Sequence, residues 1–172
     1  MNTLINNKFT SLLFFLLIIL LFPQNISSQE NWRGNTTPTY IELITHLKEI
    51  SSLHSELELY NMGTSDYGLP IYLCIVNGAK DSANTFKKAR EETTILFNNA
   101  IHPGEPDGIN ACLIWLEEIL NNKKSIKNLP VVAFIPAYNI GGILNRSSNS
   151  RANQNGPNKY GFRGNAQNLD LN

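Results

Sequence analysis

A histidine and a glutamate three positions apart are the residues of this sequence whose types and spacing best suit chemistry. His102 and Glu105 lie in the stretch His-Pro-Gly-Glu, between an apolar run and a helical pattern that begins near Ile109. An imidazole nitrogen and a carboxylate oxygen both bind zinc, at about 2.0–2.2 Å. Because Gly104 accepts backbone angles that other residues resist, we expect the turn to bring both side chains to one point. The pair predicts two of the three protein ligands of a catalytic zinc ion.

The same pair has a second interpretation. Glu105 directly precedes a predicted helix, and a carboxylate near a helix N-terminus is favourable without any metal. Taken alone, an isolated His-x-x-Glu favours this plainer interpretation.

Strands and helices alternate along the chain and would position the turn. Apolar spacing from Tyr40 to Ile50 predicts a helix, with Thr37 as its cap and Pro38 as its first residue. A second helix follows the turn. The remaining predicted elements are strands at 57–60, 71–76, 93–99 and 131–135 and a short helix at 81–91. This order predicts an α/β fold with a mixed, mainly parallel sheet flanked by helices.

The strand before the turn is predicted to be covered on both faces of the sheet. Residues 93–99 are apolar throughout their centre, which is typical of a strand covered on both faces. His102 and Glu105 come after its carboxyl end, where ligands bind in open α/β sheets.

Residues 1–28 predict a secretory signal peptide. Lys8 is the only charge before an apolar run that Pro23 ends, and small polar residues follow as far as Ser28. The alternative is a membrane anchor, but a spanning helix needs about 20 apolar residues and this run is shorter. We therefore expect a secreted or periplasmic protein with no stable membrane span after signal cleavage.

The net charge and the two cysteines indicate what the protein binds and whether it has a disulfide. The formal net charge is zero, so the composition has no basic footprint for nucleic acid. Cys74 and Cys112 fall in a predicted strand and on the apolar face of a predicted helix. We expect two buried free thiols, with a disulfide as the alternative.

The end of the chain adds a second motif. Arg163 stands nine positions before Asn172, which closes the triplet Asp-Leu-Asn. The order His-x-x-Glu, arginine, Asp-x-Asn resembles the zinc carboxypeptidases of family M14, the carboxypeptidase A/B-like enzymes, over about residues 38–172. The regulatory branch of that family has the same spacing between its arginine and asparagine.

The resemblance implies a role for each matching residue. His102 and Glu105 match the first two ligands of one zinc ion. Arg163 matches the arginine that polarises the scissile carbonyl, and Asn172 matches the asparagine that holds the substrate's terminal carboxylate. Asp170 matches the aspartate that hydrogen-bonds the zinc-bound histidine, although on spacing alone it is equally a turn residue at a strand end.

The choice of arginine and the sequence after the fourth strand both bear on the resemblance. Arg151 is a rival for the role of Arg163, and the nine-residue spacing favours Arg163. The family has Asn-Pro-Asp-Gly after its fourth strand, where this chain has Asn-Ile-Gly-Gly from Asn139.

In family order, the third ligand histidine, the general-base glutamate and the arginine partner of Asn172 all come later in the sequence. No histidine follows His102, and His46 and His54 precede the motif. We therefore expect residues 29–172 to be the N-terminal portion of a zinc peptidase catalytic domain, truncated and inactive alone.

Three functions remain open at this point. The resemblance implies a zinc metallocarboxypeptidase that acts on the C-termini of peptides or proteins. A zinc N-acyl-amino-acid deacylase shares the early His-x-x-Glu and is the alternative within enzymes. A non-catalytic remnant that binds peptides is the alternative outside them.

Overall fold

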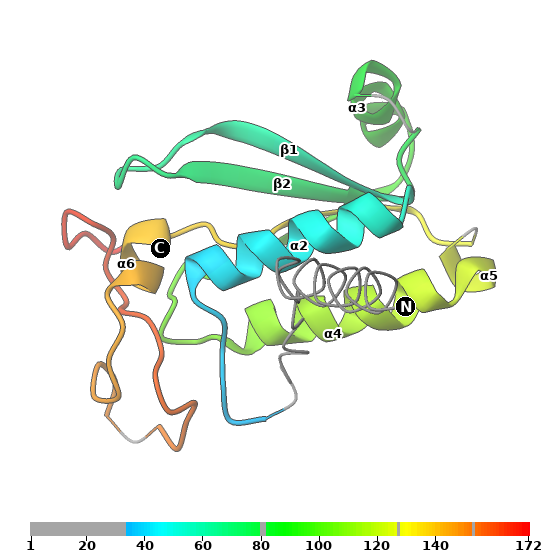
Figure 1. The fold of residues 1–172 in the computed structure, drawn as a ribbon. Coiled ribbons are helices and arrows are strands. Elements are labelled where there is room, and N and C mark those ends of the chain that lie inside the picture. Colours follow the sequence, from blue (N-terminus) through cyan, green and yellow to red (C-terminus); the bar gives the residue numbers. More distant parts are fainter. Residues whose placement is uncertain (1–33, 80–81, 127, 153) are drawn as a thin grey trace, which may run out of the picture. The chain divides into compact units, whose positions relative to one another are not determined.

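The computed structural model describes residues 34–79, 82–126, 128–152 and 154–172 (Figure 1). The predicted signal peptide, residues 1–28, lies outside the described residues. The elements in chain order are α2 (Tyr40–Leu53), β1 (Leu57–Thr64), β2 (Pro70–Val76), α3 (Ser82–Glu91), β3 (Thr94–Asn98), α4 (Asp107–Asn121), α5 (Lys123–Ile126), β4 (Val131–Ile135) and α6 (Ile140–Leu144). Each strand and helix predicted from the sequence is present. Within these ranges, no helix combines the length and apolar character that a membrane span requires.

The strands form one four-stranded sheet in the order β1-β2-β4-β3. β1 pairs antiparallel with β2, and β2 pairs antiparallel with β4. β3 and β4 are parallel, because α4 carries the chain back between them. The predicted α/β fold with a mixed sheet flanked by helices is confirmed, and among the described strands the parallel pairing is that of β3 with β4.

Helices lie on both faces of this sheet, and the side chains that alternate along β2 and β4 pack against them. One face packs against the apolar stripes of α2 and α4, and the opposite face packs against α3 (Figure 1). The strand residues on the first face are Cys74, Val76, Val132 and Phe134, and those on the second are Ile75, Val131 and Ala133. The first face holds the larger core, which extends toward the loop after β3 through Ala100 and Ala137.

β3 is an edge strand in this sheet. Ile95, Leu96 and Phe97 are 43%, 60% and 47% exposed. The expectation that this strand is covered on both faces is therefore wrong for the described chain. In the order β1-β2-β4-β3 this strand lies at the rim of the sheet, and none of its residues belongs to the buried core clusters on either face.

The start of α2 also differs from the prediction. Thr39, and not Thr37, is the N-cap, and Pro38 lies before the helix. Thr39 and Glu42 form a capping box, in which the Thr39 N–H donates to Glu42 Oε2 at 2.7 Å and the Thr39 hydroxyl accepts from the Glu42 N–H at 3.3 Å. Arg146 donates to the carbonyls of Thr37 and Pro38 and holds them outside the helix.

Replacing Thr39 by alanine is expected to lower the free energy of unfolding by about 1 kcal/mol at pH 7, because the first turn loses its cap. The hydrogen bonds from Thr39 hold the pKa of Glu42 below its usual value of 4.5. The stabilisation from Glu42 is therefore complete above pH 4.5 and is lost as the pH falls through the lowered value. Urea unfolding at pH 7 and at pH 3 measures both effects. Ser52→Ala near the exposed end of the same helix is the control, with an expected change within about 0.5 kcal/mol. Equal losses in the two variants would contradict the capping argument.

Both cysteines are free thiols, as predicted, but the predicted burial holds fully for Cys74 alone. Cys74 is fully buried in β2, and Cys112 in α4 is half-buried and accepts a hydrogen bond from Asn99 Nδ2 at 3.0 Å. Burial raises the pKa of both thiols, which keeps them protonated and unreactive.

Candidate metal centre

The site begins where the chain leaves β3. Ala100 has a φ of 57°, a left-handed conformation that residues with a Cβ atom rarely adopt. This conformation ends the strand direction and turns the chain into the loop that carries His102. The Glu105 N–H then donates to the His102 carbonyl at 2.9 Å, which closes a tight turn between the two side chains.

The glycine inside this turn has a different purpose from the one predicted. Among the described residues, the glycines with positive φ are Gly63, Gly68 and Gly156, so Gly104 does not use a left-handed angle. A Cβ atom on Gly104 would lie 2.8 Å from Arg151 Cδ and 3.2 Å from the Gly161 carbonyl oxygen. The expectation about backbone angles is therefore wrong, and the Gly161 carbonyl together with the Arg151 side chain leaves little room for a Cβ atom at this position.

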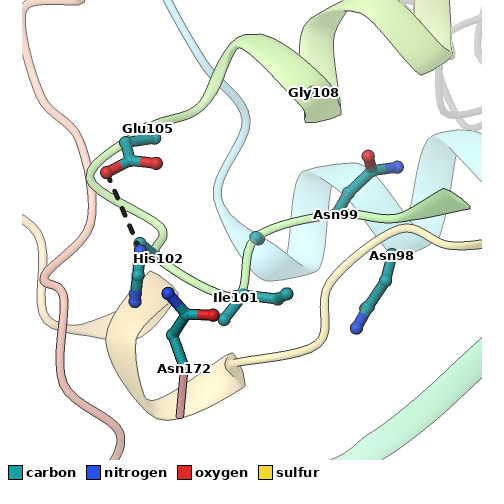
Figure 2. A pocket seen from close by; sticks show the side chains of 8 residues that line it. Asn98, Asn99, Ile101, His102, Glu105, Gly108 and Asn172 are labelled. Carbon is teal, nitrogen blue, oxygen red and sulfur yellow. Dashed lines mark ion pairs between the residues drawn. The ribbon is translucent and has the colours of Figure 1, made fainter. Parts of the chain in front are cut away.

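His102 and Glu105 face one another across the turn (Figure 2). His102 Nδ1 lies 3.7 Å from Glu105 Oε1. Two ligands of a tetrahedral zinc ion lie about 3.3–3.5 Å apart, given bond lengths of about 2.0–2.2 Å. The His102 side chain is 9% exposed and the Glu105 side chain is 51% exposed. The two donor atoms thus have a separation that fits a shared zinc ion after a shift of a few tenths of an ångström.

Asp170 orients the imidazole from the other side. Its Oδ1 lies 2.8 Å from His102 Nε2, and its Oδ2 accepts from Arg163 Nε at 2.7 Å. The hydrogen bonds from Arg163 and from His102 lower the pKa of the Asp170 carboxyl to about 2. An ionised carboxylate only accepts, so His102 carries its proton on Nε2. Nδ1 is then the nitrogen that faces Glu105 Oε1, where a neutral imidazole would offer its lone pair to a metal ion.

Two arginines approach the Glu105 carboxylate. Arg151 Nη1 lies 2.6 Å from Glu105 Oε1, and Arg163 Nη1 lies 4.0 Å from the same oxygen. The structure thus gives the two arginines different partners, since Arg151 pairs with Glu105 and Arg163 pairs with Asp170. Arg151 therefore balances the negative charge of the Glu105 carboxylate.

A polar pocket of about 320 Å³ opens beside these groups. His102, Glu105 and Asn172 line it together with residues 98–101 and Gly108 (Figure 2). Asn172 lies next to His102, and its N–H donates to Asp170 Oδ1 at 3.2 Å. The fold thus gathers all five residues singled out from the sequence, His102, Glu105, Arg163, Asp170 and Asn172.

The described part of the chain contains no group of three or more histidine, cysteine, aspartate or glutamate side chains arranged to hold a metal ion. His46, which precedes the motif, instead lies 3.2 Å from Glu117 Oε1 on α4. Among the described residues, His102 and Glu105 therefore form a pair and not a complete metal-binding group.

Sequence reasoning missed two contributors to the site. Arg151 entered only as a rival of Arg163, and its contact with Glu105 has no signal in the sequence. Asn139 entered only as a departure from the family pattern. The residue is 1% exposed, and its Nδ2 donates to the carbonyl of Ile101, which precedes His102, and to that of Arg163. A polar residue after a buried strand is ordinarily assigned to an exposed turn. The sequence therefore did not indicate that Asn139 is buried.

The fold and the grouped histidine, carboxylates and arginines define an α/β protein with a polar site beyond the end of a parallel strand. The chain belongs to the zinc carboxypeptidases of peptidase family M14, whose model matches residues 43–172. No curated protein matched the sequence.

Solved structures of carboxypeptidases resemble this chain in fold. A putative carboxypeptidase A from Shewanella denitrificans has a TM-score of 0.58 at 21% identity, and the match covers 78% of this chain and 31% of that one. The carboxypeptidase A of Helicoverpa armigera has a TM-score of 0.54 at 15% identity, and the match covers 69% of this chain and 29% of that one. A putative carboxypeptidase from Burkholderia mallei has a TM-score of 0.53 at 14% identity, with coverage of 75% and 29%. The chain thus spans about a third of the length of these structures.

Proposed function

We propose that this chain carries the metal-binding and carbonyl-binding part of a zinc metallocarboxypeptidase, which releases C-terminal amino acids from peptides. One observation carries the proposal. His102 Nδ1 and Glu105 Oε1 lie 3.7 Å apart, while Asp170 holds the opposite nitrogen of the imidazole. Membership of the zinc carboxypeptidase family supports the same assignment.

His102 and Glu105 would hold one zinc ion. Bound zinc polarises a carbonyl group and lowers the pKa of water to about 7. Glu105 contributes a negative charge that now pairs with Arg151, so metal binding requires Arg151 to share or release Oε1. Asp170 keeps the imidazole in the tautomer that leaves Nδ1 available.

Arg163 would stabilise the carbonyl oxygen of the scissile bond as that oxygen gains negative charge. A guanidinium is always charged and presents a fixed fork of donors, and fixed positive charge is most effective where negative charge develops. Its Nε donates to Asp170, which leaves the two Nη groups for the carbonyl oxygen, and Nη1 lies 4.0 Å from Glu105 Oε1. Asn172 would bind the terminal carboxylate of the substrate through its amide N–H groups.

We also propose that residues 1–28 are a signal peptide and that the protein is secreted or periplasmic. The charged start, the short apolar run and the small polar residues before Gln29 support this proposal.

The test uses the full-length protein with whatever sequence flanks these residues. Metal analysis is expected to find zinc, and incubation with peptides is expected to release C-terminal amino acids until a zinc chelator is added. Hydrolysis of N-acyl amino acids but not of peptides would replace the proposal with a deacylase. Peptide binding with neither zinc nor hydrolysis would replace it with a non-catalytic remnant.

A further inference from the structure

Asn139 lies buried directly behind the candidate metal centre. It follows β4 and precedes α6, and the residue is 1% exposed. Buried amides are retained where each of their donors and acceptors has a partner. The partners of Asn139 therefore indicate what the residue does.

The Asn139 side chain joins three separate parts of the backbone. Its Nδ2 donates to the Ile101 carbonyl at 3.1 Å and to the Arg163 carbonyl at 3.0 Å. Its Oδ1 accepts from the Gly142 N–H at 2.8 Å. Both amide hydrogens and one acceptor site are used, and a primary amide is the short side chain that supplies this set.

Two of these partners belong to the proposed catalytic machinery. Ile101 directly precedes His102, and the second carbonyl is that of Arg163 itself. The Asn139 N–H also donates to the Ala100 carbonyl at 3.0 Å, so one residue braces the left-handed turn on which His102 is mounted. A single nitrogen thus sets the separation between the loop of the metal ligands and the loop of the arginine.

The third partner extends the same connection. Gly142, which donates to Asn139 Oδ1, accepts a hydrogen bond from the Phe162 N–H at 2.8 Å. Phe162 directly precedes Arg163. The loop that carries Arg163 is therefore held by Asn139 directly and, through Gly142, at the neighbouring residue.

We propose that Asn139 is a positioning residue that fixes the His102 and Arg163 loops relative to one another. It does not contact the substrate, and its effect passes through the backbone on both sides of the site. The inference rests on the proposed function for its catalytic consequence. The bracing of the two loops is independent of whether the protein binds zinc.

The plainer alternative is that Asn139 only caps α6, since its Oδ1 accepts from the first turn of that helix. Asn139→Asp separates the two roles, because it keeps an acceptor for Gly142 and loses both Nδ2 donors. Asn139→Ser is a second variant that keeps a capping oxygen without placing a charge beside two carbonyls. Asn77→Asp is a matched control. Asn77 directly follows β2 and does not line the pocket, and the change removes the donor to the Leu129 carbonyl.

The experiment measures zinc affinity by chelator competition, and amide exchange without metal, in the full-length protein. Both Asn139 variants are expected to lower zinc affinity about 10–100-fold, the range for residues that support metal ligands. Exchange is expected to quicken in residues 101–105 and 162–164 and to stay unchanged in β2 and β4. The kcat for peptide hydrolysis should fall more than KM rises. Asn77→Asp should leave zinc affinity and kcat at the wild-type values.

Unchanged zinc affinity and unchanged exchange in Asn139→Ser would overturn the inference and leave Asn139 as a helix cap. An equal loss of affinity in Asn77→Asp would also overturn it, because general destabilisation would then explain the effect. If Asn139→Asp does not fold, Asn139→Ser decides. A wild-type protein without zinc would refute the proposed function alone, and the exchange measurement would still confirm or refute the bracing of the two loops.

Discussion

Replacing His102 by alanine is expected to abolish both zinc binding and peptide hydrolysis in the full-length protein. The variant loses the Nδ1 ligand that lies 3.7 Å from Glu105 Oε1. It also leaves the Asp170 carboxylate without its imidazole partner, so that this negative charge pairs with Arg163 alone. The expected loss of zinc affinity exceeds about 100-fold, the upper range for residues that only support a ligand.

Metal analysis after dialysis and zinc titration by calorimetry measure this effect. His46→Ala is the matched control, since it removes an imidazole that contacts Glu117 on α4, outside the site. That variant should retain zinc and activity. Retention of full zinc content by His102→Ala would refute the assignment of this ligand.

Replacing Arg163 by alanine is expected to lower kcat about 10²–10³-fold, the usual effect of removing one donor that stabilises a developing oxyanion. Arg163→Lys should recover only part of this loss, because an ammonium group keeps the charge but lacks the planar fork. Arg163 is held by Asp170, whose carboxyl group has a pKa lowered to about 2 by the hydrogen bonds from Arg163 and His102. This carboxylate is therefore ionised at neutral pH and accepts from the arginine there.

Steady-state kinetics with the same peptide also decide between the two arginines. Arg151 contacts the Glu105 oxygen at 2.6 Å, so Arg151→Ala should act chiefly on zinc affinity, which rises when a competing cation is removed. Its effect on kcat should be smaller than that of Arg163→Ala. The reverse order of the two kcat effects would transfer the role in carbonyl polarisation to Arg151.

Much of the fold was predictable because hydrophobic periodicity is a local property. The strand Val131–Ile135 and the apolar stripe of α4 follow from neighbouring residues alone. The start of α2 was less predictable, since two threonines flank Pro38 and either can cap a helix. Arg146, more than 100 positions away, holds the carbonyls of Thr37 and Pro38 outside the helix.

The candidate site was predictable to the extent that its motifs are short. His102 and Glu105 share one turn, and Asp170 and Asn172 lie two positions apart, so spacing alone brings each pair together. The chemistry of each side chain then limits its role, since imidazole and carboxylate bind metal and guanidinium binds oxyanions.

The sequence by itself thus determined the order of the elements, the family resemblance and the residue types of the site. Only the tertiary structure decided that His102 meets Asp170, 68 positions away, and that Arg151 is the partner of Glu105. It also decided that Gly104 lies close to Arg151 and the Gly161 carbonyl, and that β3 is an exposed edge among the described strands. These contacts depend on how the loops after α6 fold back over the end of β3, and no local pattern encodes a contact between segments so far apart in the chain.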